Sequence, residues 1–403
     1  MGSNQELIDR AKAASLQNYR PAPFVLTRGE GRRVWDVEGR RYLDLCAGIA
    51  VLSVGHSHPK LAAAIADQAK RLMHLSNLYY NDRAIALATE LVRRTGFARA
   101  FFCNSGTEAN EGLLKLARRY HFERGDPERV ELVGTAGSFH GRTMGVLSVT
   151  GQPKHQLGMG PLLGGTSIVP YNNLEAMRAV VTTKTAGIIV ELIQGEGGIA
   201  VADEAYIRGL RALCDERGAL LLLDEVQTGY GRTGRFLGQE WFDVKPDAFA
   251  LAKGIGGGFP LGAMMVSEKC AAGLPPGSHG STFGGNALAC AAGLAVLSIF
   301  DEERLVEASH RTGEHLRDGL LRLVGSAATS VRGRGLLQGL VLADDVDPLP
   351  TLAAIQSRGV LLSLAGGSVL RFSPPLNVTK DEIDEGLEIV NQVLRDPPTK
   401  KAS

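Results

Sequence analysis

Short apolar runs alternate with amphipathic helical stretches over residues 58–299, and this alternation restricts the fold more than any other feature of the chain. The runs are AFFCN, VELVGT, AGIIVELI, LLLLDE, DAFALA and GAMMVS. Between them lie segments such as PKLAAAIADQAKRLM and TEANEGLLKLARRYHFERG, whose apolar residues recur with helical spacing. Strands that alternate with helices predict a mostly parallel α/β sheet with helices on both faces.

The two ends of the chain have a different pattern. Residues 24–39 and 41–48 alternate apolar and polar residues around glycine turns, which predicts a small antiparallel meander. Near the C-terminus, three apolar runs precede the amphipathic helical stretch 380–394. We therefore expect a large domain over residues 58–299 and a small α+β domain built from residues 1–57 and 300–403.

The charge balance argues against a role on nucleic acid or at a membrane surface. Lys and Arg number 44 and Asp and Glu 43, which gives a formal net charge of +1. A basic excess is typical of proteins that bind those polyanionic partners. No apolar run approaches the roughly 20 residues that a membrane span needs. A small-molecule or protein partner and a cytoplasmic location are therefore expected.

Neither the cysteines nor the histidines predict a metal site. The five cysteines are scattered without a C-x-x-C pair, so a disulfide framework is not predicted either. His56 and His58 form an H-x-H pair without a third ligand nearby, and a turn before a helix at Pro59 explains them better.

The stretch ALLLLDEVQTGYGRTG, residues 219–234, ends its leucine run in two carboxylates. If residues 220–226 form a strand, Asp224 and Val226 point to one side and Glu225 to the other. Ligands of parallel sheets bind beyond the carboxyl ends of the strands, so Asp224 and Val226 can both face a bound ligand. Taken alone, the acidic pair fits a solvent-exposed loop equally well or better.

Gly229, Gly231 and Gly234 match the G-x-G-x-x-G pattern of dinucleotide-binding proteins. That fingerprint requires the glycines to open a helix directly after a strand. The following RTGRFLGQEW lacks an amphipathic helical pattern, so a nicotinamide site is not predicted.

Lys253 ends a second apolar run, DAFALA, and a glycine-rich turn follows it. Desolvation and cationic neighbours lower the pKa of an amine and make it a nucleophile that forms Schiff bases. A surface lysine at a turn is the simpler reading of this residue by itself.

The segment NSGTEANEGLLKLARR begins a helix with Ser105, Gly106 and Thr107. Free N–H groups and the positive end of the helix dipole favour an anion there, most naturally a phosphate, although simple N-capping explains the same residues. A phosphate site, a carboxylate and an amine on one sheet together match the needs of pyridoxal 5′-phosphate (PLP).

DEVQTGYGRTG and LAKGIGGGFPLGA resemble the signature of the class III (subgroup II) PLP-dependent aminotransferases, and SFHGRT, ELIQGEGG and HGSTFGGN are similar to its companion motifs. The resemblance covers essentially the whole chain. It implies PLP-dependent transferase fold type I, with a large domain around a mostly parallel seven-stranded sheet, a small α+β domain, and a homodimer with shared active sites.

The same resemblance implies roles for individual residues. Lys253 forms the Schiff base with PLP and later moves a proton, while Asp224 pairs with the ring nitrogen. Further cofactor contacts come from Ser105, Gly106, Thr107, Phe139, Val226, Gln227 and, from the partner subunit, Thr282.

Within the family the chain is most similar to the acetylornithine aminotransferases of arginine biosynthesis, which move the terminal amino group of N-acetyl-L-ornithine to 2-oxoglutarate. Arg142 then holds the substrate α-carboxylate, and Ser281 contacts the substrate. Glu196 and Arg371 form a switch that frees Arg371 for the second carboxylate of 2-oxoglutarate. Ile49 stands where ornithine aminotransferases carry tyrosine, which favours an acylated α-nitrogen.

Several alternatives stay open at this stage. Aminotransferases for succinylornithine, succinyl-diaminopimelate, ornithine or 4-aminobutyrate have similar sequences. A PLP-dependent decarboxylase or aminomutase would keep Lys253 and Asp224 and differ in the substrate pocket. A non-enzymatic binding protein is disfavoured because both residues are present.

Overall fold

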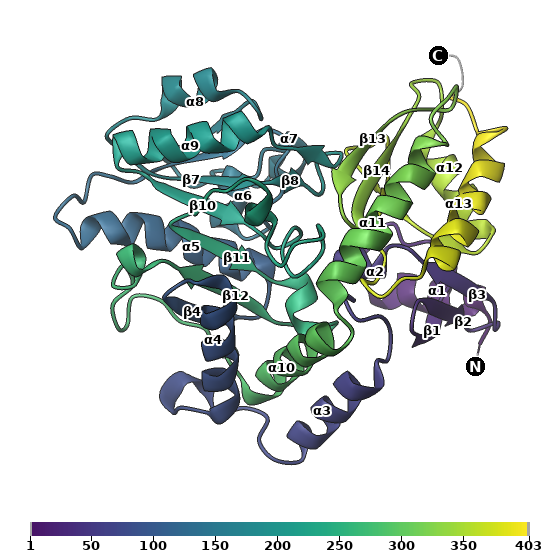
Figure 1. The fold of residues 1–403 in the computed structure, drawn as a ribbon, viewed down its shortest axis with the longest axis horizontal. Helices are drawn as coiled ribbons and strands as arrows, with labels where there is room; N and C mark the ends of the chain where they lie inside the picture. The colour runs from purple at the N-terminus through teal and green to yellow at the C-terminus, as the bar shows by residue number, and fades with distance from the viewer. Residues whose placement is uncertain (1, 401–403) are drawn as a thin grey trace.

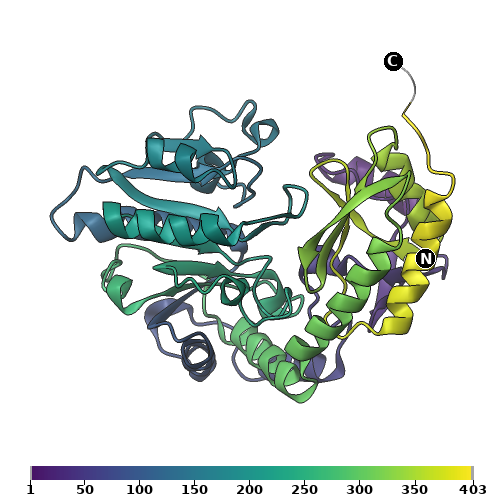
Figure 2. The same ribbon diagram turned by 45° about the horizontal axis from the view of Figure 1, so that its top comes forward.

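The computed structural model describes residues 2–400, which form a larger and a smaller part lying side by side (Figure 1). The larger part is built around a seven-stranded sheet, and the smaller part contains two four-stranded sheets. The helices α10 (Ala287–Glu302) and α11 (Leu305–Leu321) join the two parts, as Figure 2 shows at its lower edge. Within residues 2–400 no helix has both the length and the apolar character needed to cross a membrane.

The seven-stranded sheet has the order β4-β12-β11-β10-β7-β5-β6. Only β12 runs antiparallel to its neighbours, so the expected mostly parallel sheet is confirmed. Its strands are β4 (Arg99–Cys103), β5 (Glu131–Thr135), β6 (Thr166–Val169), β7 (Thr185–Glu191), β10 (Leu220–Asp224), β11 (Ala248–Leu251) and β12 (Gly262–Val266). The sequence analysis missed β6, because this edge strand exposes Ser167 and Ile168 and is too short to form an apolar run.

Successive residues of the central strands pack on opposite faces of this sheet. Leu220 and Leu222 join the apolar cluster of helix α5 (Gly106–Phe122). Leu221 and Leu223 join the cluster on the other face, to which helix α9 (Glu204–Arg217) contributes. Burial on both faces explains why β10 reads as an uninterrupted leucine run.

The smaller part combines both ends of the chain. The sheet β1-β2-β3-β15 pairs Leu43 with Val360, and the second sheet has the order β13-β14-β17-β16. Its strands are β1 (Leu26–Glu30), β2 (Arg33–Asp36), β3 (Arg41–Asp44), β13 (Ala328–Arg334), β14 (Leu337–Leu342), β15 (Val360–Leu361), β16 (Ser363–Ala365) and β17 (Val369–Phe372). The antiparallel meander β1-β2-β3 confirms the expectation for this region. The domain boundaries at residues 57 and 299 stay a prediction.

The remaining helices and strands complete the two parts and their connections. They are α1 (Asn4–Ala14), α2 (Ala47–Ala50), α3 (Pro59–Ala69), η1 (Ser76–Leu78), α4 (Asp82–Thr95), α6 (Met144–Val149), α7 (Pro153–Gln156), α8 (Leu174–Val180), β8 (Ile193–Gln194), β9 (Ala200–Val201), η2 (Gly238–Trp241), η3 (Lys253–Gly256), η4 (Glu268–Cys270), α12 (Pro348–Ser357) and α13 (Lys380–Leu394).

Candidate active site

A cavity of about 440 Å³ lies beyond the carboxyl ends of β10, β11 and β4, where the sequence analysis expects a ligand. It contains most of the predicted cofactor residues. Those lining it are Ser105, Gly106, Thr107, Phe139, Asp224, Val226, Gln227 and Lys253, and the predicted substrate residue Arg142 lines it as well.

The strand that carries Asp224 ends at that residue, two positions before the expected end at Val226. The chain turns there because the backbone N–H of Val226 donates to Asp224 Oδ1 at 3.0 Å instead of to a neighbouring strand. Asp224 and Val226 nevertheless both line the cavity, as predicted.

Glu225 points away from the cavity and is buried in its own set of donors. It accepts hydrogen bonds from Thr228 Oγ1 and from the backbone N–H groups of Gly238 and Gln239, at 2.5 to 2.9 Å. Burial raises the pKa of Glu225 to about 7, although these donors lower it. The two adjacent carboxylates therefore have different tasks, one facing the cavity and one tying down the loop.

Three donors fix the Asp224 carboxylate. Besides the Val226 N–H, Asn110 Nδ2 donates to Oδ2 at 2.7 Å and His140 Nδ1 lies 2.8 Å from the same oxygen. The His140 side chain is fully buried. Burial alone lowers the pKa of His140, but the hydrogen bond and charge of Asp224 outweigh it and the net direction is upward.

Glu191 at the end of β7 is a further buried carboxylate beside this group. It accepts from the backbone N–H of Phe139 at 2.9 Å and of Gly195 at 3.2 Å. Burial raises its pKa to about 7, while His140 opposes this shift. The sequence analysis did not find Asn110, His140 or Glu191. The position of Asn110 one helical turn after Gly106, and of His140 next to Phe139, was the available signal.

Lys253 begins the short helix η3 with φ of 50°, a left-handed backbone that is unusual outside glycine. Burial lowers the pKa of its amine, and the nearby Arg371 lowers it further. Glu196, Asp224 and Glu191 act in the opposite direction. The cavity thus contains an amine with a lowered pKa and a fixed carboxylate, the pair that Schiff-base chemistry with a pyridine cofactor needs.

Residues 105–107 open helix α5 at the edge of the cavity. Ser105 is the N-cap, and its Oγ accepts from the Glu108 N–H at 3.3 Å. A Cβ on Gly106 would lie 2.7 Å from Val226 Cγ1, so only glycine fits beside that side chain. The first turn of a long helix therefore presents its free N–H groups to the cavity.

Phe139 and Arg142 line the cavity next to Thr107, whose Oγ1 accepts from the Arg142 N–H at 3.2 Å. The Arg142 guanidinium lies 5.2 Å from the centre of the Phe139 ring. Arg142 is exposed, and its Nη2 lies 3.4 Å from His155 Nε2. Arg142 makes no salt bridge within residues 2–400, so its charge is available to a carboxylate.

Glu196 and Arg371 form a salt bridge across the junction of the two parts. Arg371 also donates to Ser363 Oγ at 3.0 Å and to the Gly195 carbonyl at 2.9 Å. Its Nη1 lies 3.4 Å from Oε1 of Gln227, which lines the cavity. Burial raises the pKa of Glu196, but the charge and hydrogen bond of Arg371 turn the net direction downward.

Five predicted residues do not line the cavity in the single chain: Glu196 and Arg371, which pair at its side, and Ile49, Ser281 and Thr282. Ile49 is 40% exposed, and its neighbour Val51 lines the cavity instead. Ser281 Oγ lies 3.4 Å from Nδ2 of the cavity residue Asn104, and Thr282 is exposed beyond it. The role of Thr282 as a contact from a partner subunit stays a prediction.

Comparison with known proteins places this geometry among related chains. The family model described as "Aminotransferase class-III" matches residues 14–394. The acetylornithine aminotransferase of Myxococcus xanthus is 47% identical over 95% of this chain and 96% of that protein. A protein of Pseudomonas aeruginosa named succinylornithine transaminase/acetylornithine aminotransferase is 43% identical over 93% of both chains.

A solved structure has the same fold. The ornithine aminotransferase of Toxoplasma gondii, whose structure reports partial occupancy of PLP at the active site, superposes with a TM-score of 0.94. It is 33% identical and covers 98% of this chain and 94% of its own.

Proposed function

The chain belongs to the class-III aminotransferases, and from that premise we propose that it moves the terminal amino group of N-acetyl-L-ornithine to 2-oxoglutarate. The products are N-acetyl-L-glutamate 5-semialdehyde and glutamate, as in arginine biosynthesis. The observation that carries this proposal is the meeting of Lys253, Asp224 and the start of helix α5 in one cavity.

The cofactor of this family is PLP, and the residues of the cavity fit it. The N–H groups at the start of α5 suit its phosphate, Asp224 suits a protonated ring nitrogen, and the Lys253 amine suits its aldehyde. Val226 and Phe139 would cover the two ring faces, and Gln227 would lie at the ring hydroxyl. When bound, PLP supplies an electron sink for the carbon next to the reacting nitrogen.

Lys253 has two tasks in this proposal. Its amine holds the cofactor between turnovers. Once substrate has displaced it, the amine would move a proton between the substrate carbon that bears the amino group and C4′ of the cofactor. The pKa lowered by burial favours the neutral form, which is the form that accepts a proton. Asp224 keeps the ring nitrogen protonated, while Asn110 and His140 hold the carboxylate in place.

Arg142 and Arg371 divide the recognition of carboxylates. Arg142 would hold the α-carboxylate of both substrates, because its guanidinium is unpaired at the cavity wall. Arg371 serves only the second carboxylate of 2-oxoglutarate or glutamate, after Glu196 has moved away. While paired, Glu196 cancels the Arg371 charge and the site accepts a donor without a second carboxylate.

The main question of substrate specificity is which acyl group the amino donor carries. The Pseudomonas aeruginosa relative carries both succinylornithine and acetylornithine in its name, so succinylornithine is the second candidate donor. Ile49 in place of tyrosine favours an acylated donor over free ornithine. In this proposal, discrimination between acyl groups rests on loops near Ile49, Ser281 and Thr282.

We further propose a homodimer with shared active sites in the cytoplasm. Ser281 and Thr282 do not line the cavity of their own chain, and Thr282 is exposed, which supports a contribution to a partner's site. All five cysteines, each within the described residues, are free thiols, which suits a reducing compartment.

The test is a half-reaction without acceptor. Holoenzyme mixed with N-acetyl-L-ornithine alone should lose the absorbance band of lysine-bound PLP and gain that of pyridoxamine phosphate. Release of carbon dioxide instead would assign the chain to the decarboxylases. The kcat/KM values for acetylornithine, succinylornithine and ornithine then rank the donors, and free ornithine as the best one would contradict the proposal.

A further inference from the structure

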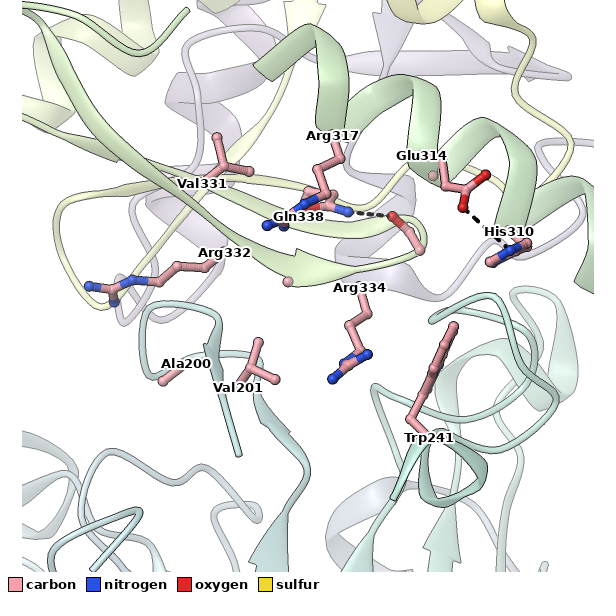
Figure 3. Close-up of a pocket in the computed structure, with 13 residues that line it drawn as sticks. Ala200, Val201, Trp241, His310, Glu314, Arg317, Val331, Arg332, Arg334 and Gln338 are labelled. Atoms are coloured by element: carbon pink, nitrogen blue, oxygen red, sulfur yellow. Dashed lines mark hydrogen bonds and ion pairs between the residues drawn. The ribbon is translucent and has the colours of Figure 1, made fainter. Parts of the chain in front are cut away.

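A second cavity, of about 690 Å³, lies between the larger and the smaller part (Figure 3). It shares no lining residue with the active-site cavity. One wall comes from β9 and from Trp241, and the other from α11 and the hairpin β13-β14.

Three guanidinium groups dominate its lining. Arg317 comes from α11, and Arg332 and Arg334 come from β13. None of the three forms a salt bridge in the part of the chain that the structure describes. The only carboxylate in the lining belongs to Glu314, which lies 3.5 Å from His310 Nε2. The cavity therefore carries a net positive charge.

The aromatic ring of Trp241 holds the central guanidinium in place. Arg334 lies 5.0 Å from the Trp241 ring centre, and Arg235 lies 4.8 Å from the same ring. Figure 3 shows Arg334 reaching from the hairpin toward the larger part, beside the flat face of Trp241. A guanidinium stacked in this way keeps its N–H edge free for an oxyanion.

Two buried polar atoms in this wall lack a hydrogen-bond partner among the described residues. They are Arg334 Nε, a donor, and Gln338 Oε1, an acceptor. The Gln338 side chain is 1% exposed, and its Nε2 already donates to the Gly335 carbonyl at 2.9 Å. Buried polar atoms are nearly always satisfied, so an unmet donor and an unmet acceptor in the lining of one cavity indicate that it binds polar groups.

We propose that this cavity binds a small oxyanion with two or more negative charges, either a phosphate compound or a polycarboxylate. Guanidinium groups match both kinds of oxyanion by paired N–H donation. The proposal concerns binding alone and does not depend on the donor substrate of the enzyme.

The test uses holoenzyme, in which PLP already occupies the phosphate site of the active centre. The chain has two tryptophans, so Trp35→Phe leaves Trp241 as the single reporter beside Arg334. Inorganic pyrophosphate and citrate are titrated separately at constant ionic strength, and tryptophan fluorescence and calorimetry are recorded. Saturable binding of at least one probe is expected, and the tighter one identifies the source of the oxygens.

Matched variants locate the site. Arg334→Gln and Arg317→Gln should each weaken binding by about tenfold, since each removes a charged hydrogen-bond donor. Arg311→Gln removes the same charge from an exposed position of α11 outside the cavity and should leave binding unchanged. Near-ultraviolet circular dichroism checks that every variant is folded.

Three results would overturn the proposal. The first is no saturable binding of either probe. The second is equal weakening by Arg311→Gln, which would indicate a non-specific charge effect. The third is loss of binding in Arg142→Gln, which would place the anion in the active-site cavity.

Discussion

Asp224 in the cofactor cavity and Glu196 at the junction of the two parts are both carboxylates close to Lys253, yet they are held in different ways. Asp224 receives three donors, all from the larger part. Among the described residues the one salt bridge of Glu196 is with Arg371, which belongs to β17 of the smaller part. In the proposed function the carboxylate that stays fixed is therefore held within one part, and the carboxylate that moves is paired across the junction.

The two carboxylates also differ in the free-energy cost of separating each from its partners. Removing Asp224 from its donors would leave His140 Nδ1 and one of the two Asn110 Nδ2–H bonds without an acceptor, which costs about 1–3 kcal/mol for each group. In the proposed function, a substrate carboxylate would replace Glu196 on Arg371 when the pair opens, so the buried guanidinium would keep an anionic partner. Substitutions in the fixed site around Asp224 and Lys253 should therefore slow both half-reactions. Substitutions in the proposed gate, the Glu196–Arg371 pair, should slow only the half-reaction with 2-oxoglutarate or glutamate.

The first prediction removes the amine at the centre of the fixed site. Lys253→Ala should abolish the absorbance band of lysine-bound PLP and lower kcat by about a thousandfold or more, because the proton transfer loses its base. Absorbance spectra and steady-state rates measure both effects. An unchanged spectrum would refute the assignment of Lys253.

The second prediction separates the two adjacent carboxylates. Asp224→Asn should lower the rates of both half-reactions by about a hundredfold, since the ring nitrogen loses its anionic partner. Its measurement is single-turnover kinetics with each substrate.

Glu225→Gln is the matched control for that variant. It should retain the PLP spectrum but lower the free energy of unfolding by about 2 kcal/mol, because the NH₂ group of glutamine would face the N–H of either Gly238 or Gln239, which bind different oxygens of Glu225. Denaturant unfolding measures this loss. A large rate effect with unchanged stability would mean that Glu225, too, serves the reaction.

The third prediction concerns the effect of Glu196 on the pH dependence of PLP uptake. Burial lowers the pKa of Lys253, and the charge of Glu196 partly restores it. Glu196→Gln should therefore move the pKa of the amine further down. The rate at which apoenzyme takes up PLP depends on the neutral amine, so its pH profile should shift to lower pH in this variant. A shift to higher pH, or none, would show that Glu196 does not act on Lys253.

Much of the fixed site follows from the sequence because its residues end strands of one sheet. The apolar runs before Asp224 and Lys253 and the capped start of α5 all mark the same edge, and a parallel sheet brings such ends together. The supporting residues Asn110, His140 and Glu191 were missed, because a buried polar residue inside a helix or strand leaves no periodic signal.

The proposed gate, Glu196 with Arg371, was predicted from the family resemblance and not from a local sequence pattern. Glu196 and Arg371 are separated by 175 positions and meet only because β17 packs against the loop after β8. The guanidinium-lined cavity at the same junction was not predicted for the same reason. Its walls come from segments as distant as Ala200 and Gln338.

The comparison of the two half-reactions in Arg371→Ala tests the central claim most directly. Stopped-flow absorbance with N-acetyl-L-ornithine should give a rate within about threefold of the wild type, as expected for an interaction absent from that step. The second-order rate constant for the half-reaction with 2-oxoglutarate should fall by about a hundredfold, because the charged pair between Arg371 and the second carboxylate is lost. Equal loss in both half-reactions would contradict the division between a fixed cofactor site and a separable gate.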